Sequence, residues 1–114
     1  MTLTEERLDA AFSALADPTR RAIITRLSEG EATVKELAEP FPISLQAISK
    51  HIRVLERAGL ISQGVDAQRR PCRIETDTAD ELVNWITEQK QRWEGRLDAL
   101  EAHLEQVQIK ESNA

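Results

Sequence analysis

Apolar residues in the N-terminal part of the chain recur with the spacing of a helix. Four of them follow one another at i, i+3, i+4 and i+7: Leu8, Ala11, Phe12 and Leu15. This period predicts an amphipathic helix over about residues 5–16, with Thr2 and Thr4 as candidate caps. Asp17 and Pro18 are typical of the N-cap and the first turn of a second helix, which Gly30 would end.

Two further helices, joined by a short turn, are predicted next. Thr33 and Glu36 have the spacing of a capping box, in which each side chain satisfies a free backbone amide of the first turn. Two prolines within residues 40–42 exclude a continuation of that helix, and Ser44 is the next N-cap. The sequence therefore predicts a helix-turn-helix over about residues 33–58.

The helix that begins after Ser44 has two chemically different faces. Its apolar positions Ile48, Ile52 and Leu55 share one face. The opposite face carries mostly polar and cationic residues: Gln46, Ser49, Lys50, Arg53 and Arg57. One side is thus predicted to join the core and the other to meet solvent or a ligand.

Beyond this helix the hydrophobic period changes to two residues, which indicates short strands. Ile61, Gln63 and Val65 fall on one face of a first strand. Cys72 and Ile74 fall on one face of a second. We expect a hairpin, or wing, over about residues 61–75. Its polar connection would carry two arginines near the tip, Arg69 and Arg70.

The last segment is predicted to be one long helix. Thr78 and Glu81 have capping-box spacing, and no proline follows, which indicates a helix over about 79–107 and a frayed tail at 109–114. A coiled-coil seam with one slip near Trp93 runs along it: Leu82, Ile86, Gln89, Trp93, Leu97, Leu100, Leu104 and Val107. Such a seam requires a partner helix.

Length and composition fit a single domain, here residues 1–108. The chain has 114 residues, 40% hydrophobic and 31% charged. No apolar run approaches the roughly 20 residues that cross a bilayer, and the N-terminus lacks the apolar stretch of a secretory signal. The single cysteine, Cys72, excludes an internal disulfide. We therefore expect a cytoplasmic protein.

The formal net charge of −5 hides a segregation along the chain. Residues 1–43 carry a net charge of −3, residues 44–74 carry +4, and residues 75–114 carry −6. A basic segment between acidic flanks favours one surface that meets phosphate. That segment coincides with the cationic helix and the wing.

A short helix, a turn, a cationic helix and a basic hairpin together predict a mainly α fold, a winged helix-turn-helix that binds double-stranded DNA. Gln46 is the best candidate for reading a base, because its amide matches the donor and acceptor of an adenine edge. Four further residues would contact phosphates or make mixed contacts: Ser44, Ser49, Lys50 and Arg53. Arg69 and Arg70 on the wing would reach the flanking backbone or the minor groove, and Ala47 is a further DNA-binding candidate.

Two motifs resemble the arsenic-repressor (ArsR) family of transcriptional regulators. They are ALADPTRR at residues 14–21 and SLQAISKHIRVLERAGLI at 44–61, and the likeness extends from Leu8 to about Leu104. The resemblance implies a homodimer joined by the first and last helices that represses transcription, often of its own operon, until a signal releases it. The implied dimer interface comprises Leu8, Phe12, Leu82, Ile86, Trp93, Leu97, Leu100 and Leu104.

The sequence departs from the family in its metal ligands. The third helix, TVKELAEP, has no thiol, and the chain offers only Cys72, His51 and His103 as soft or imidazole ligands. Zinc or arsenic sites require three or four converging ligands, so we expect no metal and no cofactor. Two alternatives remain open: a dimeric protein-interaction module without operator binding, and a redox or metal sensor based on Cys72.

Catalysis is not indicated. The triplet at residues 49–51 joins a serine, a lysine and a histidine, but consecutive helical residues diverge by about 100° and do not converge on a substrate. The four glycines are too dispersed for a phosphate-binding loop. We expect no enzyme.

Overall fold

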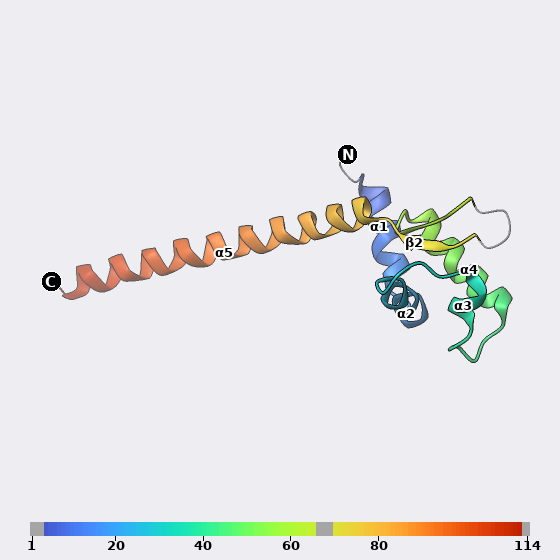
Figure 1. Ribbon diagram of the computed structural model, residues 1–114. Helices are drawn as coiled ribbons and strands as arrows, with labels where there is room; N and C mark the ends of the chain where they lie inside the picture. The colour runs from blue at the N-terminus through green and yellow to red at the C-terminus, as the bar shows by residue number, and fades with distance from the viewer. Residues whose placement is uncertain (1–3, 66–69, 113–114) are drawn as a thin grey trace. The chain divides into compact units, whose positions relative to one another are not determined.

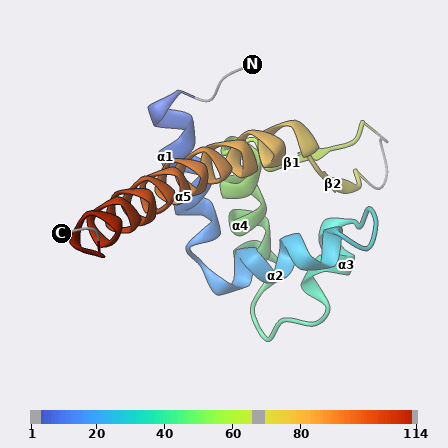
Figure 2. The ribbon, with the colours of Figure 1, turned by 90° about the vertical axis from the view of Figure 1, so that its left-hand side faces the viewer.

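The computed structural model describes residues 4–65 and 70–112 of the chain (Figures 1 and 2). Its contacts divide the chain into two compact units, residues 1–81 and 82–114. Of the described residues, those in the first unit form helices α1 to α4, the strands β1 and β2, and the start of α5. The second unit is the remainder of α5.

The first two helices begin at the caps that the sequence indicates. Helix α1 spans Glu5–Leu15, and the Thr4 side chain accepts a hydrogen bond from the backbone N–H of Arg7. Helix α2 spans Pro18–Leu27, and the Asp17 side chain accepts from the N–H of Arg20. These bonds satisfy amides that have no partner inside the helix.

The helix-turn-helix consists of α3, Val34–Ala38, and α4, Leu45–Arg57. The predicted capping box of Thr33 is present, and Ser44 caps α4. Helix α4 is followed by Gly59, whose φ of 78° is the left-handed region that glycine adopts without strain. The N–H of Leu60 donates to the carbonyl of Leu55 at 3.0 Å, which closes the last turn.

The wing is an antiparallel pair of three-residue strands, β1 (Ile61–Gln63) and β2 (Cys72–Ile74). Ile61 lies opposite Ile74 and Gln63 opposite Cys72. Ala32, between α2 and α3, exchanges two backbone hydrogen bonds with Cys72, at 2.7 and 3.2 Å. This bridge is not predictable from the sequence, because a single bridging residue produces no alternation of apolar and polar positions.

The core of the first unit is built around α4, which contacts α1, α2, α3 and β1. Ile48, Ile52 and Leu55 are completely buried. Other completely buried side chains come from the surrounding elements: Ile23 of α2, Leu37 of α3 and Cys72 of β2. The predicted fold class, a mainly helical winged helix-turn-helix with a hairpin and a long C-terminal helix, is confirmed.

The last helix is longer than the sequence indicated. Helix α5 spans Thr76–Ser112, so it begins before Thr78 and continues past residue 107. The N–H of Glu75 donates to the carbonyl of Leu60 at 2.9 Å, which extends the hairpin up to the helix start. Thr78 is therefore no cap but a buried residue beside Gly59.

At its other end, α5 includes residues 109–112 of the segment expected to fray. No residue between Gly95 and Ser112 interrupts the helix, and Lys110 in the last turn complements the negative end of the helix dipole.

Among the described residues, no helix is both long and apolar enough to span a membrane.

Candidate nucleic-acid interface

Helix α4 presents a polar and cationic stripe on the side opposite its buried face. Gln46, Lys50, Arg53 and Arg57 follow at intervals of four, three and four residues, and all are exposed. This spacing places them in one line along the helix. The stripe offers one amide and three positive charges to a ligand.

The other predicted residues of α4 lie beside this stripe. Ser49 and Ala47 are half-buried, on opposite flanks of the helix. The Ser44 hydroxyl accepts the N–H of Ala47 at 3.1 Å, so its oxygen holds the helix start. Its O–H hydrogen is available to donate to a phosphate. The N-terminal turn of α4 also has the positive end of the helix dipole.

The wing adds cationic side chains. Arg70 is exposed and adopts a φ of 41°, in the left-handed region. Arg69 lies outside the described residues. Arg73, which the sequence analysis did not single out, donates to the Ser62 hydroxyl at 3.3 Å and lies 3.9 Å from a carboxylate oxygen of Glu75. Its charge is thus partly balanced within the wing.

The motif at residues 14–21 connects α4 to the first two helices. The guanidinium of Arg20 donates to the carbonyls of Ala14 at 2.6 Å and Ser13 at 3.2 Å, at the end of α1. Its Nη1 also lies 3.3 Å from Nδ1 of His51 on α4. Sequence reasoning recognised the cap at Asp17 but missed this junction, because Arg20 and His51 are 31 residues apart in the chain.

Asp17 belongs to the same junction. The hydrogen bond from the N–H of Arg20 lowers the pKa of Asp17 below its ordinary value of 3.8. Positive charge at His51 and Arg20 acts in the same direction, against partial desolvation. The carboxylate is therefore held ionised, 3.9 Å from the His51 ring.

Cys72 is completely buried in the wing. Burial raises the pKa of its thiol, and the negative charge of Glu56 adds to this effect. A protonated, buried thiol is a poor nucleophile, which disfavours the sensor alternative. Within residues 4–65 and 70–112, no three His, Cys, Asp or Glu side chains are grouped so as to hold a metal ion.

The residues predicted for a dimer interface fall into two groups. Leu8 and Leu82 are already buried, at 8% and 7% exposure. The others keep between 37% and 60% of their surface exposed: Phe12, Ile86, Trp93, Leu97, Leu100 and Leu104. Those on α5 are large apolar side chains on the surface of a helix, which is the signature of an interaction surface.

Most of the exposed apolar residues of α5 form a seam with unbroken seven-residue spacing. Its members are Val83, Ile86, Trp93, Leu97, Leu100, Leu104 and Val107, and Lys90 fills the one polar position. The seam expected from the sequence includes Leu82 and Gln89 and has a slip near Trp93. Because Leu82 is buried and Val83 is 60% exposed, the exposed seam passes through Val83 and needs no slip.

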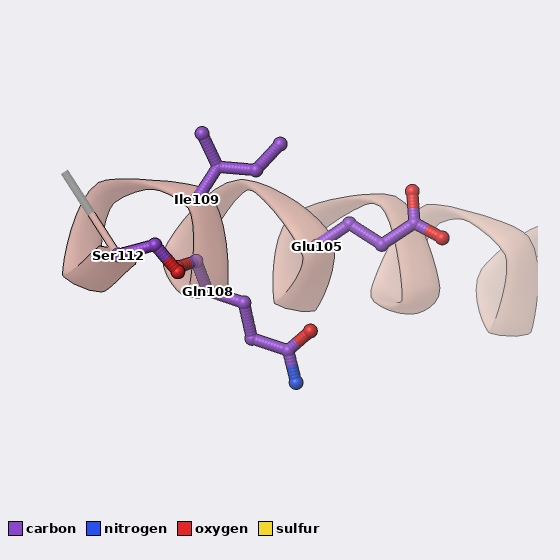
Figure 3. A pocket seen from close by; sticks show the side chains of 4 residues that line it. All are labelled: Glu105, Gln108, Ile109 and Ser112. Carbon is purple, nitrogen blue, oxygen red and sulfur yellow. The ribbon is translucent and has the colours of Figure 1, made fainter.

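A shallow hollow near the C-terminal end of α5 is lined by Glu105, Gln108, Ile109 and Ser112 (Figure 3). All four side chains come from the same helix. Small-molecule sites are concave and bury most of their ligand, which one helix surface does not do. This hollow is therefore not a candidate ligand site.

The fold and the stripe on α4 define a winged helix-turn-helix DNA-binding domain, and comparisons with known proteins agree. A family model described as a helix-turn-helix domain matches residues 15–63. The chain is 47% identical over 62 residues to the HTH-type transcriptional regulator Rv2034 of Mycobacterium tuberculosis. The matched residues are 54% of this chain and 58% of that protein. The chain is also 34% identical over 79 residues to the transcriptional repressor SdpR of Bacillus subtilis. This match covers 69% of this chain and 88% of that protein.

A similar solved structure gives the family. The crystal structure of the ArsR family transcriptional regulator RHA00566 has a TM-score of 0.75 and 45% sequence identity, and the match covers 82% of this chain and 97% of that one. The chain belongs to the ArsR family of transcriptional regulators. The sequence-based identification of this family, and of a DNA-binding regulator, is confirmed.

Proposed function

We propose that this protein is a cytoplasmic homodimer that binds a pseudo-palindromic operator near its own promoter and represses transcription. Helix α4 would enter the major groove, where Gln46 contacts a base edge. The surrounding polar and cationic residues would hold phosphates or reach the flanking minor groove: Ser44, Ser49, Lys50, Arg53, Arg69 and Arg70. Ala47 would lie against the DNA without a polar side-chain contact. Repression is supported by the name of SdpR, a transcriptional repressor.

The observation that carries the proposal is the division of α4 into two faces. Ile48, Ile52 and Leu55 have no exposed surface, whereas the stripe from Gln46 to Arg57 is exposed along the whole helix. The core therefore fixes α4 firmly while its cationic face remains accessible. The cationic side chains of such a helix would contact phosphates and position it on the DNA, and the amide near its N-terminus would contact a base edge.

The dimer is supported by the seam on α5. Isolated helices are marginal in water, and most helix stability in proteins comes from packing an apolar face. A second copy would bring an identical seam and so cover both helices. Two recognition helices related by a two-fold axis would then meet half-sites about one helical turn, roughly 34 Å, apart.

The DNA-binding part is tested by titrating the protein into a labelled fragment of its own upstream DNA, with an unrelated fragment of equal length as control. If each protomer neutralises three to five phosphates, log affinity should fall against log salt with a slope of roughly −5 to −9. Equal, salt-independent affinity for both fragments contradicts the proposal.

Two variants separate base reading from phosphate binding. Gln46→Ala should lower discrimination between the operator and a mutated operator, because it removes a base contact. Arg70→Ala should weaken both complexes about equally, because a phosphate contact carries no sequence information. Equal losses of discrimination in the two variants would show that Gln46 is not the base reader.

The dimer is tested by placing charges in the seam. Leu97→Glu combined with Leu104→Glu should lower the mass measured by sedimentation equilibrium from twice 12.9 kDa toward 12.9 kDa. Ile109→Glu is the matched control, since Ile109 is also exposed on α5 but lies outside the seam. An unchanged dimer in the double variant contradicts the role of the seam.

A further inference from the structure

Two large apolar side chains stand exposed at the start of α4. Ile43 is 41% exposed and Leu45 is 53% exposed, on either side of the N-cap residue Ser44. Ile48 and Ile52 of the same helix are completely buried, whereas Ile43 and Leu45 keep much of their surface exposed. The start of α4 therefore presents apolar surface outside the core.

Their position borders the polar stripe. Leu45 is the first residue of α4. Because helical side chains tilt toward the N-terminus, its side chain lies at the N-terminal end of the helix. Gln46 lies about 100° further around the helix, and Ser49 follows Leu45 by four residues on the same flank. An apolar surface and an amide thus lie next to each other at the end of the helix that approaches bases.

The charge around this pair decides which partner fits. The apolar centre of a protein–protein interface is depleted of charged residues, whereas Lys50 and Arg53 follow directly on the adjoining stripe. The segment 44–74 as a whole carries a net charge of +4. A polyanion with an apolar group on its surface matches both features. Thymine supplies that group, because its C5-methyl points into the major groove.

We propose that Leu45, supported by Ile43, is a specificity-determining contact for the C5-methyl group of a thymine next to the base read by Gln46. This inference rests on the proposed DNA-binding function and names a sequence feature of the operator. Each half-site should contain a thymine at that place. Burying one methyl group corresponds to an affinity change of about fourfold.

The test compares thymine with uracil, which has the same hydrogen-bonding edge without the methyl group. The full chain is first used to select binding duplexes from a random-sequence library. A selected duplex is then made with thymine or with uracil in its half-sites, and both are titrated with wild type, Leu45→Ala and Ile43→Ala. Ile109→Ala is the matched control, an exposed isoleucine that lies far along the chain.

Wild type and Ile109→Ala should bind the thymine duplex about fifteenfold more tightly than the uracil duplex, because each of the two half-sites contributes about fourfold. Leu45→Ala should bind both duplexes equally, with the affinity that wild type has for uracil, and Ile43→Ala should show a reduced ratio. If Leu45→Ala keeps the wild-type ratio, or if wild type does not distinguish the duplexes, the inference is wrong while DNA binding stands. If the library yields no specific duplex, the proposed function itself fails.

Discussion

The guanidinium of Arg20 joins the end of α1 to helix α4, with Nη1 3.3 Å from Nδ1 of His51. Arg20 is the donor in this pair, because a guanidinium carries N–H groups and no acceptor. The same guanidinium satisfies two carbonyls at the end of α1. One side chain of α2 therefore links α1 and α4.

Replacing Arg20 should cost more stability than replacing its neighbour. Arg20→Ala should lower the free energy of unfolding by about 1.5–3 kcal/mol, since it leaves two carbonyls and His51 without a charged donor. Arg21→Ala, the matched control, removes one exposed bond to the Leu15 carbonyl and should cost about 1 kcal/mol or less. Equilibrium urea unfolding measures both, and equal losses would contradict the role assigned to Arg20.

Two glycines should respond to alanine in opposite directions. Gly59→Ala should cost about 1–2 kcal/mol, because its φ of 78° is strained for an L-residue. Its new Cβ would also lie 3.2 Å from the side chains of Arg7 and Thr78. Gly95→Ala should gain about 1 kcal/mol, because it lies inside α5 with nothing within 4 Å of the new atom. Urea midpoints shifted in the same direction would contradict this pair of expectations.

The Cys72 thiol should be inert in the folded protein. It is completely buried and its pKa is raised, so little thiolate is present or accessible at neutral pH. Iodoacetamide should modify Cys72 only after unfolding in urea, as followed by mass spectrometry. Rapid modification of the native protein would contradict this and restore the thiol-sensor alternative.

Asp17 should make stability depend on acid pH. Its pKa is lower in the folded than in the unfolded chain, so its ionised form stabilises the fold above the ordinary carboxyl pKa. This contribution should be lost as the pH falls from about 4 through the lower folded-state value. Asp17→Asn keeps a capping oxygen without the charge.

The measurement is urea unfolding of wild type and Asp17→Asn between about pH 5 and pH 3. The stability difference between the two proteins should shrink toward the acid end. The reason is that the protonated carboxyl of wild type and the amide of the variant then both lack a negative charge beside Arg20 and His51. A difference that is constant across this range would show that the charge of Asp17 does not contribute.

The local features of this protein could be predicted from the amino-acid order alone. The caps Thr4, Asp17, Thr33 and Ser44 were predictable because each bonds an amide three residues away. The buried face of α4 was predictable from a period of 3.6 residues. The family motifs, which cover neighbouring positions, were recognisable for the same reason.

The relationships between distant positions became known only from the folded chain. The Arg20–His51 contact, the bridge between Ala32 and Cys72, and the packing of Thr78 beside Gly59 join residues that no local pattern connects. Burial also decides which of two adjacent apolar residues belongs to the exposed seam of α5, since Leu82 is buried and Val83 is exposed. Local hydrogen bonds and periodicity are encoded by spacing along the chain, whereas burial depends on which segments the fold brings together.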